Sequence, residues 1–424
     1  MRSTRRYLPI LAGALTLAGL AGTAQAQTVL NAGGSSAGRN FATDVPLNLC
    51  DAAPLPNRFS TADGNKITWT CNRGGLPVIM RYSATGSNDG VNKLLQPTSN
   101  PASNMLFLDH TLTTGCTGPT LTTRPSDSKQ YNNTTNCNNA NTISLPVHMG
   151  ASDVQGASFH QTGPIGTSVT PLDDSTLNSV TVAIVPFSLY VGKGVVRLNA
   201  AGDAPAGPIS GLSRLEVERI FSGSVTDWQQ LGFGTVTDGL PTTLEATSPI
   251  ILCQRNAGSG TKATFDETVM INATETSIAN ASHQFFSSTS GVLGCVATNR
   301  RAIGYMDSDQ VVAFNPLGAQ AGNAYTVRLD GGLAHDPSLT DPKRDLKCGK
   351  YAYWAGWRLN RRTTSEGVDI DALAQAYVDN ANLQATIGII PTGAYWASDE
   401  EMFVSKNVDK GPLIFKVGAH PGCR

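Results

Sequence analysis

The segment Arg255-Asn256-Ala257-Gly258-Ser259-Gly260-Thr261-Lys262-Ala263-Thr264-Phe265 places an arginine, two glycines and three hydroxyl side chains within eleven residues. The preceding residues 248–253 have the apolar pattern of a buried strand, and residues 264–270 have a helical pattern. We therefore expect a turn from a strand into a helix. Free N–H groups at a helix N-terminus attract anions, and glycines let the backbone approach a ligand. An arginine adds a planar fork of donors, so the segment predicts an oxyanion site.

Two better-known glycine-rich motifs do not match this segment. A P-loop requires G-x-x-x-x-G-K-[ST], whereas Lys262 follows Thr261 and precedes Ala263. A nucleophile elbow, G-x-S-x-G, requires glycines where Ala257 and Thr261 stand. An ordinary Gly/Ser turn that caps a helix is the structural alternative.

Five short segments elsewhere in the chain form an ordered series with residues 255–261. They are residues 31–36 (N-A-G-G-S-S), 82–91 (Y-S-A-T-G-S-N-D-G-V), 150–153 (G-A-S-D), 220–228 (I-F-S-G-S-V-T-D-W) and 301–305 (R-A-I-G-Y). Taken in order, the six segments resemble the sequence pattern of periplasmic phosphate-binding proteins, the solute receptors of phosphate ABC importers. The last segment departs from that pattern, with Arg301 in place of a glycine.

The resemblance implies an α/β fold of the two-lobed type 2 periplasmic-binding-protein class. Each lobe would be a mixed sheet flanked by helices, with the ligand in the cleft between the lobes. We expect lobe I to comprise residues 27–182 and 319–424, and lobe II residues 183–318. Residues 109–149 look like an insertion in lobe I, and we expect them to form a disulfide-closed surface loop. Short strands at 28–30 and 76–82 would each lead into a glycine-serine turn and a helix.

The resemblance also implies which residues hold the anion, carried over position by position. These are Ser35, Ser36 through its backbone N–H, Ser87, Asp153, Arg255, Ser259, Gly260 and Thr261.

Asp153 is the unusual member of this set, because an ionised carboxylate can only accept hydrogen bonds. It would repel an anion that lacks a proton and accept a hydrogen bond from one that has a proton. Phosphate at neutral pH is protonated and sulfate is not. The presence of Asp153 in the site therefore predicts that the protein selects phosphate over sulfate. The structural alternative for Asp153 is a helix N-cap.

The chain departs from the family pattern at two places in the predicted site. Ser35-Ser36 stands where the family has a threonine followed by an aromatic residue. Asn256-Ala257 replaces the usual serine and aspartate, and in the family that aspartate pairs with the arginine. Arg255 therefore needs another partner to orient it.

Residues 1–26 have the pattern of a signal peptide. Arg2, Arg5 and Arg6 form the basic start, an apolar stretch follows, and A-Q-A ends near Ala26 as a cleavage site. Gln27, and not a cysteine, comes directly after that site, so we expect no lipid anchor and a periplasmic or secreted product.

The eight cysteines are an even count in a chain expected to be exported, which favours disulfides over metal binding. Joining sequence neighbours is the simplest of the 105 possible connectivities. It gives Cys50–Cys71, Cys116–Cys137, Cys253–Cys295 and Cys348–Cys423.

The formal net charge of −1 argues against general attraction to nucleic acid or to an anionic membrane. None of the six histidines lies in a matched segment, so we expect no catalytic activity, no cofactor and no metal. The predicted function is the capture of inorganic phosphate by a monomer, for delivery to an ABC permease. The alternatives are a receptor for arsenate, phosphite or an organophosphate, a phosphate-ester hydrolase, and a secreted adhesin or matrix protein that retains the fold.

Overall fold

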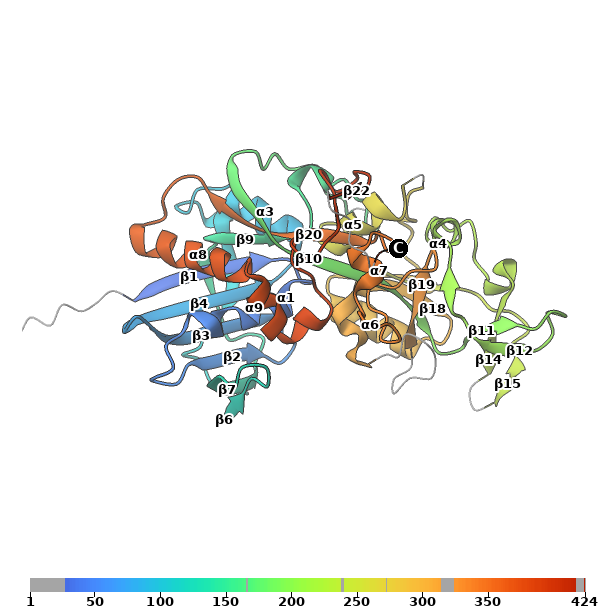
Figure 1. The fold of residues 1–424 in the computed structure, drawn as a ribbon, viewed down its shortest axis with the longest axis horizontal. Coiled ribbons are helices and arrows are strands. Elements are labelled where there is room, and N and C mark those ends of the chain that lie inside the picture. The colour runs from blue at the N-terminus through green and yellow to red at the C-terminus, as the bar shows by residue number, and fades with distance from the viewer. Residues whose placement is uncertain are drawn as a thin grey trace, which may run out of the picture.

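The computed structural model describes residues 27–164, 167–237, 240–271, 273–313, 324–416 and 423. The chain forms two lobes that lie side by side and meet at two central strands, β10 (Leu177–Gly192) and β20 (Trp354–Arg362) (Figure 1). The predicted signal peptide, residues 1–26, lies outside the described residues. Of the helices that the structure describes, none combines the length and apolar character that crossing a membrane requires.

The first lobe is built on a sheet whose strands run in the order β20-β9-β1-β4-β3-β2-β7-β6. Their bounds are β1 (Thr28–Gly34), β2 (Asn57–Thr61), β3 (Lys66–Arg73), β4 (Leu76–Ala84), β6 (Thr117–Thr123), β7 (Gln130–Cys137) and β9 (Met149–Ser152). β1 is parallel to both β4 and β9, and Gly34 pairs with Ala84 and with Ala151. Because the carboxyl ends of parallel strands meet at one edge of a sheet, the loops after these three strands converge.

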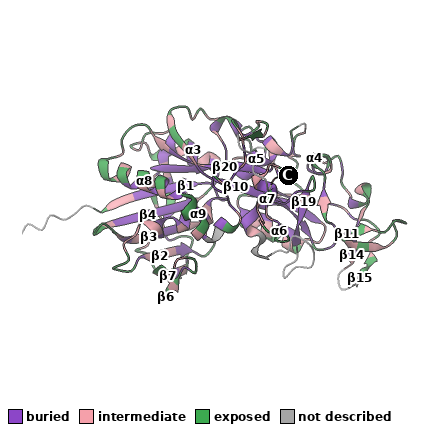
Figure 2. Ribbon diagram, viewed as in Figure 1, coloured by how far each residue is buried: buried purple, intermediate pink, exposed green. Residues whose placement is uncertain are grey.

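Helices cover both faces of this sheet. They are α1 (Arg39–Asp44), α2 (Pro46–Leu49), α3 (Ser87–Leu94), α8 (Val368–Ala381) and α9 (Gln384–Ile389). The main core includes α1 and α8, and there Phe41 stacks on Trp396 with the ring centroids 5.0 Å apart. A separate cluster packs Leu94 of α3 against Met105 and Phe107. Figure 2 shows that the buried residues follow the central strands and the faces of the helices that cover them.

The segment 109–149 is closed by the Cys116–Cys137 disulfide, as predicted, but it contains strands where the sequence analysis expected a loop. It contributes β6 and β7, which extend the main sheet, and β8 (Thr142–Pro146), which pairs with β5 (Asn104–Leu108). β7 pairs in parallel with β2, and β6 forms the edge of the sheet. The prediction failed because the segment is polar, although its many threonines are β-branched and suit a strand with one solvated face.

The second lobe repeats the arrangement of the first on a smaller sheet. Its strands are β13 (Gly211–Leu212), β16 (Ile251–Arg255), β17 (His283–Phe286), β18 (Ala302–Asp307) and β19 (Ala324–Leu329), and its helices are α4 (Arg214–Phe221), α5 (Gly260–Thr268) and α6 (Thr289–Thr298). β16 is parallel to both β17 and β18, so the ends of these three strands also converge. The predicted turn from a strand into a helix is the connection from β16 to α5.

A separate small sheet projects from the far end of the second lobe (Figure 1). It contains β11 (Val195–Leu198), β12 (Pro205–Pro208), β14 (Phe233–Thr237) and β15 (Leu240–Leu244). The remaining elements are α7 (Arg344–Lys347), β21 (Val404–Ser405), β22 (Ile414–Phe415) and the short 3₁₀ helices Pro101–Ser103, Gly156–Ser158, Trp228–Leu231, Ser308–Ala313 and Pro391–Ala394.

The lobe boundaries differ from the predicted ones at 182/183 and 318/319. β10 stays paired with β20 as far as Pro186 and pairs with β18 from Phe187 onward, so the chain enters the second lobe a few residues later than expected. Position 318/319 lies outside the described residues, but β19, which follows it, still pairs with the second-lobe half of β10. The chain therefore returns to the first lobe at β20. The error arose because a strand that serves both lobes has no break in its apolar pattern.

Four disulfides join the same cysteines that the sequence analysis paired. They are Cys50–Cys71, Cys116–Cys137, Cys253–Cys295 and Cys348–Cys423. Each joins cysteines that are neighbours in the series of eight, which restricts the unfolded chain and contributes about 2–4 kcal/mol to the stability of a typical protein. Cys253 lies in β16, and its disulfide to Cys295 joins this strand to α6 next to the predicted anion site.

Candidate functional site

The first lobe contributes a buried carboxylate held by two hydroxyl groups. Ser35 follows β1, Ser87 begins α3 after β4, and Asp153 follows β9, so all three lie where the parallel strands end. The Oγ of Ser35 donates a hydrogen bond to Oδ1 of Asp153, and the Oγ of Ser87 lies 3.3 Å from Oδ2. The exposed fraction of each of these residues is at most 1%. The carboxylate is therefore fixed in position and removed from water.

The second lobe contributes a guanidinium and a helix N-terminus. Arg255 ends β16 and is 1% exposed. Its Nη1 donates to Oγ1 of Thr261 at 3.4 Å, in the first turn of α5. Ser259 is the N-cap of that helix and accepts from the backbone N–H of Lys262 at 3.3 Å. A cation and the positive end of a helix thus share one location, which is the arrangement expected for binding an oxyanion.

The two halves touch across the cleft. Nη2 of Arg255 donates to Oγ of Ser36 in the first lobe at 2.9 Å. Gly260 fits only because it lacks a side chain, since a Cβ there would lie 2.3 Å from Oγ of Ser87 and 2.5 Å from Oδ2 of Asp153. The structure therefore brings all eight residues of the predicted site to one place between the lobes, in a chain whose lobes are closed on each other.

Arg255 is oriented by two residues that the sequence analysis missed. Its Nη1 also donates to Oγ1 of Thr289, at the start of α6, at 3.2 Å. That hydroxyl donates in turn to Oδ1 of Asp307 at 2.8 Å. Asp307 ends β18, which is parallel to β16, and it stands two residues beyond the matched segment 301–305. Through Thr289, Asp307 supplies a carboxylate for Arg255 in place of the family aspartate that Ala257 replaces. The signal that could have predicted this role is the position of Asp307 at the end of a strand parallel to β16.

We call the eight predicted site residues the cradle. A second pair of contacts joins the two lobes beside it. Nδ2 of Asn40 in the first lobe donates to Oδ2 of Asp309 at 3.0 Å. Burial, and then the neighbouring Asp307, raise the pKa of Asp309 well above its usual value. The backbone N–H of Asn88 donates to the carbonyl oxygen of Gly258 at 3.1 Å. These contacts hold the closed arrangement independently of the cradle residues themselves.

Lys262 does not face the cradle, although it follows the glycine-rich turn. Its Nζ lies 2.7 Å from Oε1 of Glu275, and both side chains are almost fully buried. The hydroxyl of Tyr305 donates to the same carboxylate and accepts from the backbone N–H of Arg255 at 3.4 Å. This ion pair supports the back of the β16–α5 turn, consistent with the mismatch to a P-loop.

The electrostatics of the cradle depend on the burial of Asp153. Burial raises the pKa of this carboxyl to about 6, a rise that the hydrogen bond from Ser35 opposes and the charge of Asp307 strengthens. Burial also lowers the pKa of Arg255 below its usual value, while the charge of Asp307 acts in the opposite direction. Above pH 6 the cradle therefore presents an acceptor-only carboxylate opposite a guanidinium. Within the described residues, no cluster of three or more side chains suited to holding a metal ion occurs.

Comparisons with known proteins agree with this architecture. Residues 165–341 match the family model for the PBP superfamily domain. The chain is similar in structure to a proposed phosphate ABC transporter substrate-binding protein from Clostridium perfringens, solved with bound phosphate. That likeness has 12% sequence identity and a TM-score of 0.50, and it covers 88% of this chain and 99% of the other.

The chain is also similar to a phosphate-binding protein from Stenotrophomonas maltophilia, with 13% identity, a TM-score of 0.44, and coverage of 85% of this chain and 83% of the other. A search of the curated proteins gave no match. The likeness to the Clostridium perfringens protein confirms the predicted two-lobed α/β fold, and residues 165–341 match the PBP superfamily domain.

Proposed function

We propose that this chain is an extracytoplasmic receptor that captures inorganic phosphate between its two lobes and delivers it to an ABC importer. The proteins that it resembles in structure are named for phosphate binding and phosphate transport. The four disulfides support a location outside the cytoplasm, because such bonds persist in oxidising compartments.

The observation that carries the proposal is the meeting of Asp153 and Arg255 at the N-terminus of α5. Gly260 lies against the carboxylate, and Thr261 bonds to the guanidinium. An anion held there would receive donors from Arg255 and the helix and would face an acceptor at Asp153. Only an anion that carries a proton can satisfy that acceptor, and phosphate does so at neutral pH.

The remaining predicted residues complete the coordination. Ser35, Ser36 and Ser87 place hydroxyl groups on the first-lobe side, and each already hydrogen-bonds an opposing or neighbouring cradle group. On phosphate binding these bonds would be exchanged for bonds to the ligand. The proposal includes no covalent step, because the cradle acts through hydrogen bonds and charge.

Isothermal titration calorimetry of protein stripped of bound anions tests this function. We expect tight binding of phosphate, no detectable binding of sulfate at pH 7.5, and loss of the phosphate signal in Arg255→Ala. Lys93→Ala, at a partly exposed position of α3 where the side chain pairs, among the described residues, only with Asp89, is the matched control and should bind as the unaltered protein does. A folded, stripped protein that ignores phosphate would refute the proposal, and hydrolysis of 4-nitrophenyl phosphate would replace it with the hydrolase alternative.

A further inference from the structure

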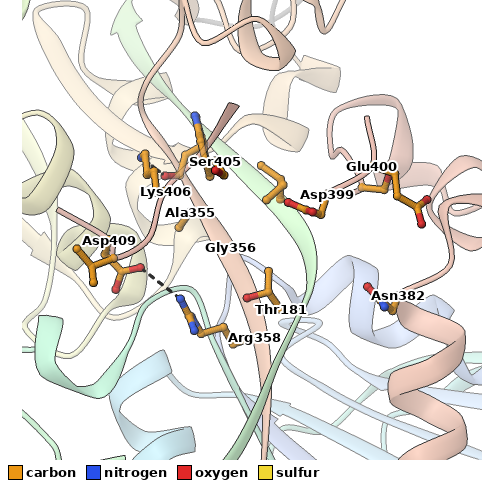
Figure 3. Close-up of a pocket in the computed structure, with 14 residues that line it drawn as sticks. Thr181, Ala355, Gly356, Arg358, Asn382, Asp399, Glu400, Ser405, Lys406 and Asp409 are labelled. Atoms are coloured by element: carbon orange, nitrogen blue, oxygen red, sulfur yellow. Dashed lines mark hydrogen bonds and ion pairs between the residues drawn. The ribbon is translucent and has the colours of Figure 1, made fainter. Parts of the chain in front are cut away.

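A cavity of about 360 Å³ lies at the junction of the lobes, apart from the cradle. Its floor is formed by β10 and β20, the two strands that join the lobes, and its wall is formed by residues 398–409 (Figure 3). Thr181, on the floor, adjoins the irregularity in the β10–β20 register. The volume is within the range of small-molecule sites, about 300–1,000 Å³. We call this cavity the hinge pocket.

Arg358, on β20, presents unused donors to the hinge pocket. Its Nε is buried and has no hydrogen-bond partner among the described residues. Its Nη2 forms a long ion pair with Oδ1 of Asp409 at 3.9 Å (Figure 3), which is too far for a hydrogen bond. A partly buried guanidinium usually has its donors hydrogen-bonded, as in Arg362, four residues along the same strand. Its guanidinium donates to the carbonyl oxygens of Lys93, Gln96 and Val147 and to Glu366. A partly buried guanidinium with no hydrogen bond therefore marks a place where a partner can be supplied from outside.

The other ionic groups near Arg358 already have partners. Oδ2 of Asp409 accepts from the backbone N–H of Gln155 and from Oγ of Ser158, both at 2.7 Å. Nζ of Lys406 donates to the carbonyl oxygens of Ala352 and Trp354 at 2.9 and 2.8 Å. The two bonds from Gln155 and Ser158 fix Asp409 through Oδ2. Its Oδ1, which they leave free, is the atom that forms the long ion pair with Arg358.

The charges that line the hinge pocket exclude the simplest ligands. Asp399 and Glu400 lie on the side of the pocket opposite Arg358 and Asp409 (Figure 3). The lining thus holds three carboxylates, one guanidinium and one lysine, and Asp399 is also paired from outside the lining by Nζ of Lys416, 2.9 Å from its Oδ2. Burial lowers the pKa of the lining lysine, Lys406, to about 7, which reduces its charge near neutrality. A simple anion would leave Glu400 without a cation among the described residues, and a simple cation would leave the donors of Arg358 without a hydrogen bond.

We propose that the hinge pocket binds a small zwitterion, with its carboxylate on Arg358 and its ammonium group toward Asp399 and Glu400. Such a molecule pairs both ends of the pocket, and a carboxylate can bind a guanidinium through two parallel hydrogen bonds. Hydroxyl and amide groups of Thr181, Ser398 and Asn382 also line the pocket. The site does not depend on the phosphate proposal, because no cradle residue lines it.

Calorimetric titration of the full chain with a matched set of four-carbon probes tests the site. 4-Aminobutyrate carries both charges, butyrate lacks the ammonium group, and butylamine lacks the carboxylate. We expect 4-aminobutyrate to bind at least 10-fold more tightly than either single-charge probe. Equal affinities for all three, or no binding of 4-aminobutyrate, would overturn the proposal.

Variants locate the binding on the pocket. Arg358→Gln should weaken 4-aminobutyrate at least 10-fold, whereas Arg361→Gln, on the same strand but bonded to the exposed Gln375, should leave it unchanged. Glu400→Gln, at an exposed position, should weaken 4-aminobutyrate and leave butyrate no weaker, and it serves if Arg358→Gln fails to fold. Unchanged affinity in folded Arg358→Gln, or in Glu400→Gln, would refute the assignment of the two ends.

Discussion

The cradle and the hinge pocket both lie where the two lobes meet, and both place an arginine near an aspartate, yet the two arginines are in opposite states. Arg255 is 1% exposed and donates to Ser36, Thr261, Thr289 and the carbonyl oxygen of Ser287. The side chain of Arg358 is 20% exposed and makes no hydrogen bond with any residue that the structure describes. The first guanidinium is held in place before a ligand arrives, and the second is only positioned by its strand. The hydroxyl groups of Ser36, Thr261 and Thr289 preorganise Arg255 for a ligand, and Arg358 has no such partners within the described chain.

The largest expected effect is the difference in phosphate affinity between two variants in which one of the two arginines is replaced by lysine. Arg255→Lys keeps the charge but loses the planar fork, so we expect phosphate affinity to fall ~10³-fold. Arg358→Lys should change phosphate affinity by less than about 2-fold, because it lies outside the cradle. Calorimetry on both variants measures the contrast. Similar losses in the two variants would show that the cradle and the hinge pocket are not separate sites.

Asp153→Asn should alter selectivity more than affinity. An amide can donate a hydrogen bond, so it no longer rejects an anion without a proton, and we expect the preference for phosphate over sulfate to fall ~10²-fold. The unaltered protein should show the same change on acidification, because Asp153 becomes protonated below its pKa of about 6. Sulfate titrations at pH 5 and pH 7.5 measure this. Sulfate binding that does not depend on pH would count against the assigned role of Asp153.

The free energy of unfolding should depend on pH because of the same carboxyl, Asp153. The folded-state pKa of Asp153, about 6, is above the unfolded value of about 3.9, so folding binds a proton between these values. The resulting stabilisation is fully present below pH 4 and is lost as pH rises through 6, by roughly 2–3 kcal/mol. Urea unfolding of ligand-free protein from pH 4 to 7 should show this loss, and Asp153→Asn should remove it. A slope shared by both proteins would place the titrating group elsewhere.

Thr289→Val should give a smaller effect, because it leaves Arg255 in place and breaks only its link to Asp307. We expect phosphate affinity to fall ~10-fold, the value of about one hydrogen bond to a charged group. Thr298→Val on the same helix removes a hydroxyl that donates to backbone oxygens of its own helix and accepts from the side chain of Asn299, with no contact to Arg255, and should leave affinity unchanged. Equal affinities in the two variants would show that the relay through Thr289 does not orient the guanidinium.

The sequence predicted the elements whose signal is local. The apolar run before Arg255 became β16, the glycine-serine turn became the N-terminus of α5, and the cysteines paired with their neighbours. The loops after β1, β4 and β9 were predicted from their glycines and serines, and parallel pairing brings them together.

What the sequence did not predict depends on pairing between distant strands. Thr289 and Asp307 reach Arg255 only because β17 and β18 flank β16 in parallel, which no local pattern specifies. β6 and β7 were missed because polar threonine- and asparagine-rich strands lack the alternation of apolar residues that identifies a half-buried strand. The contacts of Thr289 and Asp307 with Arg255, and the strands β6 and β7, depend on which strands pair and cannot be predicted from residue type.

The continuity of β10 has a consequence for dividing the molecule into parts. Its residues Leu177–Pro186 complete the sheet of the first lobe and Phe187–Gly192 complete that of the second, within one unbroken strand. A cut between the lobes would therefore leave each piece with a shortened strand and an unpaired sheet edge, which is prone to aggregation. The two lobes should consequently melt in a single cooperative transition, and neither should be obtainable as an independent soluble fragment.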